Sequence, residues 1–187
     1  MRGRLIVVSG PSGAGKGTLI RAALEEVESL AYSVSATTRA ARPGEADGED
    51  YIFLSREEFE RWIDEGRFLE WAEYSGNLYG TLEPPVDRLL EAGVSVILEI
   101  ELQGARQVRK RRPDAEMVFV SAPSLEETRR RLAGRSTETV DAVRRRMDAA
   151  QVEVEARAEF DHEVINGELE RSRAAMIDLI CGIIDNQ

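Results

Sequence analysis

The residues best suited to chemistry stand near the N-terminus, in the run Gly10, Pro11, Ser12, Gly13, Ala14, Gly15, Lys16, Gly17 and Thr18. Glycines let the backbone take positive φ and approach an anion without an intervening Cβ. Lys16 supplies a positive charge that can reach the terminal phosphates of a nucleotide. The run therefore predicts a loop that binds polyphosphate.

One position in this loop departs from the common pattern G-x-x-x-x-G-K-[ST]. Gly17 stands where the hydroxyl that helps to hold Mg²⁺ is usually found, and Thr18 follows one place later. We assign Thr18 as the metal-associated hydroxyl, acting with nucleotide phosphates and water. An ordinary glycine-rich turn is the alternative. The apolar strand before the loop and the amphipathic run after it favour phosphate binding.

A second set of residues suits a phosphate monoester. Arg39 and Arg42 stand three residues apart, and Tyr51 and Tyr79 follow. Guanidinium groups make charge-assisted, often bidentate bonds to phosphate, and a phenol adds a donor without a counter-charge. For the arginines alone, the alternative is a solvated surface turn.

Glu70 adds a group that can recognise a base. One carboxylate can accept hydrogen bonds from both the N1–H and the N2–H₂ donors on the edge of guanine. Ser35 and Thr81 carry hydroxyls that can complete this recognition. Together, the phosphate-binding set and the base-binding set predict a site for a guanine nucleotide.

The elements that would position these residues alternate along the chain. Strand-like apolar runs occur at residues 5–8, 94–100, 117–120 and 164–165, and helical periodicity occurs at 16–29, 84–92, 102–111, 125–133, 139–158 and 169–184. Ser55 with Glu58, and Ser124 with Glu127, are candidate capping boxes. This alternation predicts an α/β fold in which helices flank a parallel sheet.

Residues 35–82 do not follow the alternation, because they contain short polar strands, one short helix and most of the aromatic residues. We interpret them as an inserted small mixed α/β lobe within a single domain, whose core comprises residues 1–34 and 83–187. Ligands of parallel sheets bind beyond the carboxyl ends of the strands. The lobe would therefore lie over the phosphate loop and bind a second substrate.

Composition limits the possible partners. The 187 residues carry a formal net charge of -10, whereas nucleic-acid binding normally requires a broad basic surface, so nucleic acid is excluded as the main partner. No segment approaches the roughly 20 apolar residues of a membrane span, and no secretion signal is apparent. The lone Cys181 has no disulfide partner within the chain. We therefore expect a cytoplasmic protein without a membrane partner.

Several blocks of sequence, in the same order, resemble the guanylate kinase family. They comprise residues 10–16, 33–44, 47–53, 68–72, 77–81, 103–105, 131–135 and 161–166. The resemblance implies a parallel sheet of the P-loop NTPase type with a GMP-binding lobe and a mobile lid. It also implies phosphorylation of GMP, with dGMP as a further acceptor, by ATP bound with Mg²⁺.

The resemblance implies roles for individual residues as well. ATP would be bound by the phosphate loop together with Arg135 and Asn166. Residues 125–146 would form the lid. The catalytic cations would be Lys16, Arg39, Arg135 and Arg146. The GMP-binding residues would be Ser35, Arg39, Arg42, Tyr51, Glu70, Tyr79, Gly80, Thr81 and Glu101.

Glu99 and Glu101 depart from the family, which usually has aspartate at both positions, and their carboxylates reach about one methylene further. Two other functions are alternatives. Guanylate kinase-like domains of scaffold proteins bind phosphorylated peptides without catalysis, but they typically lack the intact loop that Lys16 completes here. A kinase for another nucleoside monophosphate fits Glu70 and the arginine pair less well.

Overall fold

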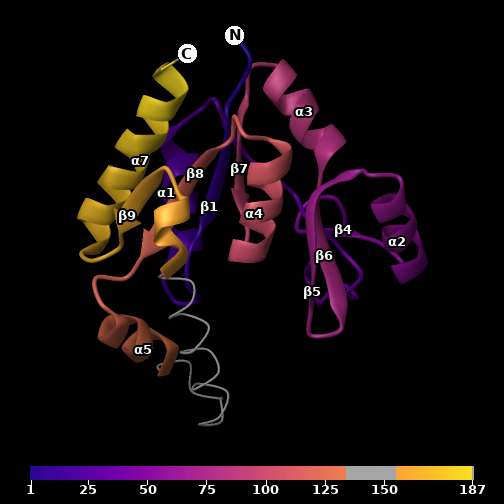
Figure 1. Ribbon diagram of the computed structural model, residues 1–187, viewed down its shortest axis with the longest axis horizontal. Coiled ribbons are helices and arrows are strands. Elements are labelled where there is room, and N and C mark those ends of the chain that lie inside the picture. Colours follow the sequence, from indigo (N-terminus) through magenta and orange to yellow (C-terminus); the bar gives the residue numbers. More distant parts are fainter. Residues whose placement is uncertain (134–154, 187) are drawn as a thin grey trace.

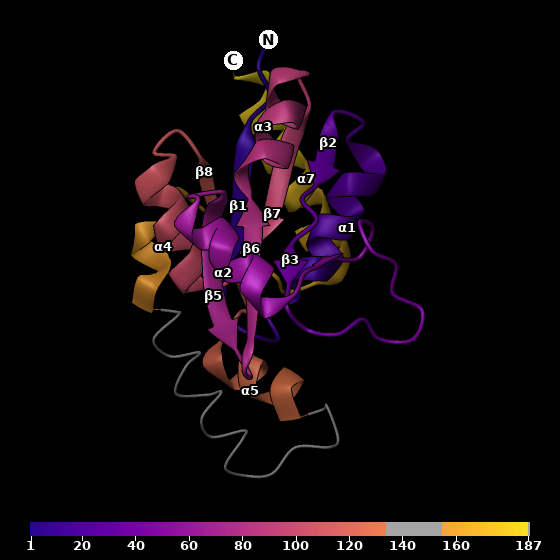
Figure 2. The ribbon, with the colours of Figure 1, turned by 90° about the vertical axis from the view of Figure 1, so that its right-hand side faces the viewer.

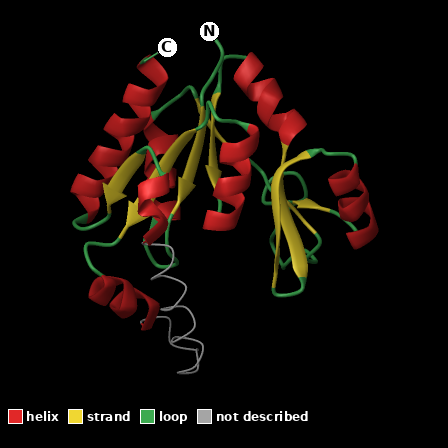
Figure 3. Ribbon diagram, viewed as in Figure 1, coloured by secondary structure: helices red, strands yellow, loops and turns green. Residues whose placement is uncertain are grey.

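The computed structural model describes residues 1–133 and 155–186. Within these ranges the chain forms two separate sheets (Figures 1 and 3). The larger sheet has five strands in the order β2-β7-β1-β8-β9, and all neighbours are parallel. These strands are β1 (Leu5–Ser9), β2 (Leu30–Tyr32), β7 (Ser95–Glu99), β8 (Glu116–Ser121) and β9 (His162–Ile165). The predicted α/β fold is confirmed.

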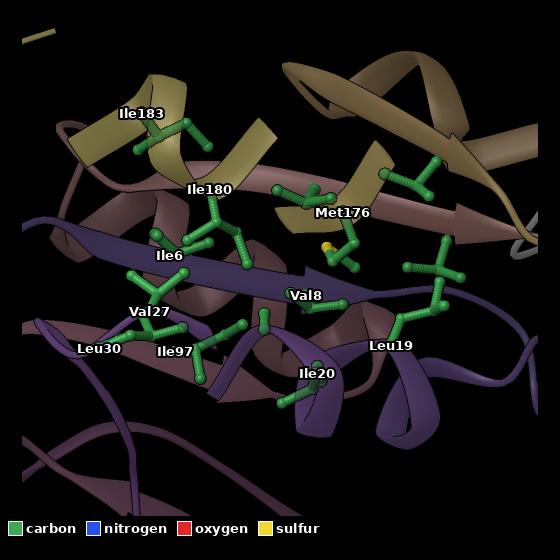
Figure 4. Packing of buried hydrophobic residues seen from close by; sticks show 14 of the residues in the cluster. Ile6, Val8, Leu19, Ile20, Val27, Leu30, Ile97, Met176, Ile180 and Ile183 are labelled. Carbon is green, nitrogen blue, oxygen red and sulfur yellow. The ribbon is translucent and has the colours of Figure 1, made fainter. Parts of the chain in front are cut away.

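Helices cover both faces of this sheet, which explains why its central strand is a continuous apolar run. Successive side chains of β1 point to opposite faces. Ile6 and Val8 pack with Met176 in the core shown in Figure 4, and Leu5 and Val7 belong to the core on the other face. The covering helices are α1 (Lys16–Glu26) and α7 (Leu169–Asp185) on the first face, and α3 (Glu83–Glu91) and α4 (Leu102–Arg111) on the second.

The smaller sheet has four strands in the order β4-β3-β6-β5. It is mixed, because β3 pairs with β4 in parallel and with β6 antiparallel. Phe59 and Phe68 stack in its core with ring centroids 4.3 Å apart. Its elements, which Figure 2 shows from their own side of the molecule, are β3 (Ala36–Thr37), β4 (Ile52–Phe53), α2 (Arg56–Asp64), β5 (Phe68–Tyr74) and β6 (Asn77–Leu82).

Most of the helix boundaries follow the sequence pattern. Helices α4 and α5 (Leu125–Ala133) have the predicted bounds. The Oγ atoms of Ser55 and Ser124 accept hydrogen bonds of 3.1 Å from the backbone N–H groups of Glu58 and Glu127, so the serine half of each predicted capping box is present. The two glutamate carboxylates accept from arginines of their own helices instead. None of the helices in the described ranges is long and apolar enough to cross a bilayer.

Three local predictions were wrong or incomplete. Helix α1 ends at Glu26 instead of residue 29, because Val27 turns to an extended conformation and packs into the core. The sequence pattern did not reveal β2, whose three residues include only one that is buried. The end of the helix predicted at 139–158 is a 3-10 turn, Ala156–Glu159, and residues 139–154 lie outside the described part of the chain.

Candidate functional site

The predicted phosphate loop connects β1 to α1. Gly10, Gly13 and Gly15 have φ values of 139°, 84° and 85°, a region that favours glycine. Gly15 is the N-cap residue of α1, and no side chain caps this helix start. The first N–H groups of a helix have no intrahelical partner, and the helix dipole adds positive potential there. The loop therefore has the geometry of an anion-binding site.

Lys16 lies over this loop. Its Nζ donates to the backbone oxygen of Gly10 at 2.6 Å and to that of Pro11 at 3.4 Å. The ammonium group is therefore held at the mouth of the loop, where a bound polyphosphate would meet it.

The side chain of Asn166 contacts the backbone of the loop. It follows β9, is buried, and donates from Nδ2 to the backbone oxygen of Ala14 at 2.7 Å. A Cβ on Gly15 would overlap Nδ2 of Asn166. The amide thus has a structural contact with the loop, and its predicted contact with ATP stays a prediction.

We expect Gly15→Ala to destabilise the protein by about 2–4 kcal/mol, because it combines a strained positive φ with an overlap against Asn166. Gly44→Ala is the matched control. Gly44 also has a positive φ, 93°, but nothing lies within 4 Å of its added Cβ. Urea unfolding of both variants measures the difference. Equal losses of stability would show that Asn166 does not constrain the loop.

A cavity of about 210 Å³ lies between the two sheets. It is lined by Ser35, Tyr51, Glu70, Ala72, Tyr74, Tyr79 and Gly80 from the side of the small sheet, and by Glu99, Ile100, Glu101 and Gly104 from the side of the large sheet. Six of the nine residues predicted to bind the monophosphate line this cavity directly. Ala72, Ile100 and Gly104 were not predicted, because small or apolar lining residues carry no chemical signal in sequence; Tyr74 also lines the cavity and was not predicted.

Glu70 lines the cavity, and the buried Thr81 bonds to its carboxylate. The Glu70 side chain is buried, and its Oε1 accepts a hydrogen bond of 2.8 Å from Oγ1 of Thr81. Burial raises the pKa of Glu70, the hydrogen bonds from Thr81 oppose that rise, and the charge of Glu101 adds to it. Each carboxylate oxygen has a second lone pair, so Glu70 can accept further bonds from a ligand.

Arg39 is held at one end of the site. Its Nη1 and Nη2 donate to the two carboxylate oxygens of Glu45, both at 2.9 Å, and its guanidinium lies 5.3 Å from the centre of the Tyr51 ring. The bond to Glu45 is the main reason that the pKa of Arg39 lies above its ordinary value, and a bond with Tyr79 contributes. The two tyrosines and Arg39, predicted to bind one phosphate, are therefore close together.

Glu45 is a residue that the sequence analysis missed. It also accepts a hydrogen bond of 2.7 Å from the backbone N–H of Arg42, and its pKa is lowered, chiefly by the bond from Arg39. The sequence indicates this interaction only through the position of a carboxylate three residues after Arg42. The Arg42 side chain is exposed.

Glu99 and Glu101 stand at the carboxyl end of β7. Glu99 faces the phosphate loop, where its Oε2 lies 3.4 Å from the position that a Cβ on Gly17 would occupy. Burial raises the pKa of Glu99, and the charge of Lys16 opposes that rise. Glu101 is exposed at the N-cap of α4 and lines the cavity. Both carboxylates therefore line the cavity, and Glu99 also lies beside the phosphate loop.

Two predicted catalytic cations, Arg135 and Arg146, lie outside the described residues, as do residues 134–146 of the predicted lid. Thr18 is exposed in the first turn of α1.

Comparison with known proteins gives a consistent result. The family model for guanylate kinase matches residues 2–181. Guanylate kinase of Rubrobacter xylanophilus is 72% identical over 183 residues, which cover 98% of this chain and 96% of that protein. Guanylate kinase of Synechococcus elongatus is 53% identical, with 93% and 95% covered. The crystal structure of guanylate kinase from Anaplasma phagocytophilum aligns with a TM-score of 0.73 at 32% identity, covering 97% of this chain and 86% of that one.

Proposed function

Because this chain belongs to the guanylate kinase family, and is therefore an enzyme that converts ATP and GMP to ADP and GDP, we propose that GMP binds in the cavity between the sheets and ATP on the loop of residues 10–18. One observation carries this assignment. The buried carboxylate of Glu70 lines the same cavity as Glu99, and Glu99 also lies beside Gly17 of the anion-binding loop, at the carboxyl end of β7, where α/β proteins bind ligands.

Glu70 reads the base in this proposal. Its carboxylate accepts from N1–H and N2–H₂ of guanine, whereas the corresponding edge of adenine has an acceptor at N1 and no 2-amino group. Thr81 holds one carboxylate oxygen in place, and Ser35 and Glu101 border the base. A site built to bond a donor strongly rejects a ligand that lacks it, because its buried acceptor is then left unpaired.

The phosphate of GMP is bound by Arg39, Arg42, Tyr51 and Tyr79. The bidentate bond to Glu45 fixes the Arg39 guanidinium beside Tyr51, which lowers the conformational entropy lost when the phosphate arrives. The hydroxyls of the two tyrosines donate to phosphate oxygens. In this way one end of the cavity binds anion and the other binds purine.

The residues around Gly17 fit a magnesium ion carried by ATP. Mg²⁺ prefers oxygen ligands and keeps several waters in protein sites. Without a side chain on Gly17, space remains between the loop and the Glu99 carboxylate, and the hydroxyl of Thr18 lies on the same helix turn. Thr18 and Glu99, through water, would hold the ion beside the phosphates. When bound, Mg²⁺ neutralises charge on the transferred group.

Catalysis then consists of alignment and charge neutralisation, since phosphoryl transfer requires little covalent work from the protein. Lys16 and the N–H groups of the loop bind the donor phosphates, and Arg39 fixes the acceptor phosphate.

An acceptor comparison tests this assignment of the cavity. With ATP and Mg²⁺ present, we expect GMP to support ADP formation at least about 100-fold more efficiently, as kcat/KM, than AMP, because adenine lacks both donors for Glu70. A coupled ADP assay measures the ratio, with GMP-free reactions as the baseline. A ratio near one would show that Glu70 does not read the base.

A further inference from the structure

The carboxylate of Glu70 lies just after an irregularity in β5. Phe68 pairs with Leu82, but Glu70 pairs with Thr81, so β5 carries one extra residue at this point. Such bulges redirect side chains. Three consecutive buried side chains reach three different places: Phe68 enters the core of the small sheet, Leu69 that of the large sheet, and Glu70 the cavity. An irregular strand needs additional contacts to fix its register.

Helix α4 supplies such a contact through Gln107. β5 is an edge strand, and the backbone of Trp71, one residue after Glu70, bonds to Gln107 instead of to another strand. Trp71 N–H donates to Oε1 of Gln107 at 3.2 Å, and Nε2 of Gln107 donates to the Trp71 oxygen at 2.8 Å. A single side-chain amide thus occupies both backbone groups, as a neighbouring strand would.

The same face of α4 makes two more contacts with this strand. Gly104 lies three residues before Gln107, and Arg111 four residues after it, so all three share one side of the helix. Nη1 of Arg111 donates to the Phe68 oxygen at 2.6 Å, on the other side of the bulge. A Cβ on Gly104 would lie 2.6 Å from Oε2 of Glu70 and 3.2 Å from its carboxyl carbon. Helix α4 therefore both holds the strand and leaves room for the carboxylate.

We propose that Gln107 is a positioning residue for guanine recognition: its amide fixes β5 just past the bulge and, with the space above Gly104, orients the Glu70 carboxylate toward the base. This inference rests on the proposed role of Glu70. It means that α4, which packs on the large sheet, contributes to the selection of guanine by a residue of the small sheet. The carboxylate of Glu70 is aimed from two sides, by Thr81 within its own sheet and by α4 from the other.

The test begins with Gln107→Leu, which keeps the length of the side chain and removes the amide. We expect the KM for GMP to rise about fivefold while kcat and the KM for ATP stay unchanged, because only the orientation of Glu70 is loosened. The preference for GMP over IMP should also fall, since IMP lacks the 2-amino group. The matched control is Lys110→Leu, an exposed position on the same helix, which should change none of these values.

A double-mutant cycle shows whether Gln107 acts through Glu70. In the Glu70→Gln background, Gln107→Leu should have no further effect on the KM for GMP, whereas an independent structural role would multiply the two effects. Gly104→Ala provides a second measurement. Alanine favours helix, yet its Cβ displaces the carboxylate, so the KM for GMP should rise without any loss of thermal stability.

The outcomes separate the two proposals. If Glu70→Gln raises the KM for GMP and Gln107→Leu does not, the positioning role is wrong and the assignment of the cavity stands. If neither substitution changes the KM for GMP, the assignment of the cavity fails as well. A Gln107→Leu variant that lowers kcat for every acceptor equally, with additive effects in the cycle, also overturns the positioning role.

Discussion

Replacing Lys16 with methionine is expected to lower kcat by about 10³-fold, the largest effect among the substitutions considered for this protein. The ammonium group is held above the loop by the Gly10 and Pro11 carbonyls. In the proposed complex it would meet the charge that develops on the transferred phosphoryl group. Methionine keeps much of the length of the side chain and removes the charge. Steady-state ADP formation at saturating ATP and GMP measures the loss.

Two controls accompany this variant. Lys110→Met makes the same chemical change at an exposed position of α4 and should leave kcat unchanged. Calorimetric titration of Lys16→Met with GMP should give the wild-type affinity, because no residue of the loop lines the cavity. A kcat within tenfold of wild type would contradict the role given to Lys16.

Glu70→Gln is expected to raise the KM for GMP by about 100-fold, because glutamine presents one acceptor and one donor where guanine presents donors. The KM for ATP should remain as in the wild type. Thermal stability at neutral pH should not fall, since the substitution removes a charge whose burial is unfavourable. Coupled assays measure the expected rise in the KM for GMP, and a melting curve shows whether thermal stability is kept. A lower melting temperature with an unchanged KM would contradict the proposal.

The pH dependence follows from the raised pKa of Glu70. In the proposed complex guanine bonds to the ionised carboxylate, so the affinity for GMP should weaken as pH falls through the folded-state pKa, above the pH at which an ordinary glutamate would protonate. The stability of the fold depends on pH in the opposite direction to GMP binding. A carboxyl group with a raised folded-state pKa adds stability when protonated, below its unfolded pKa, and this contribution is lost as pH rises through the folded-state pKa.

The sequence predicted the parts of the fold that depend on local pattern. Alternating apolar runs gave the parallel sheet, and the glycine spacing before Lys16 gave the loop, whose three positive φ values the structure contains. Helix caps at Ser55 and Ser124 were also predictable, because a cap and its N–H partner are three residues apart. In each case the interacting residues are close in the chain, so their types and spacing carry the information.

The features that were missed depend on contacts between distant residues. Strand β2 is defined by pairing with β7, since its own three residues have little strand pattern. Gln107 bonds to the backbone of a residue 36 positions away, and nothing in the sequence around it distinguishes it from a surface glutamine.

The longer side chain of Glu101 lines the cavity and stays exposed.

A crystal structure of the protein with bound GMP would locate both the base and the phosphate. The proposed function predicts that N1 and N2 of guanine lie within hydrogen-bond distance of the Glu70 carboxylate, with the phosphate on Arg39, Tyr51 and Tyr79. A complex in which the base contacts other residues, or in which the phosphate of GMP occupies the loop of residues 10–18, would contradict it.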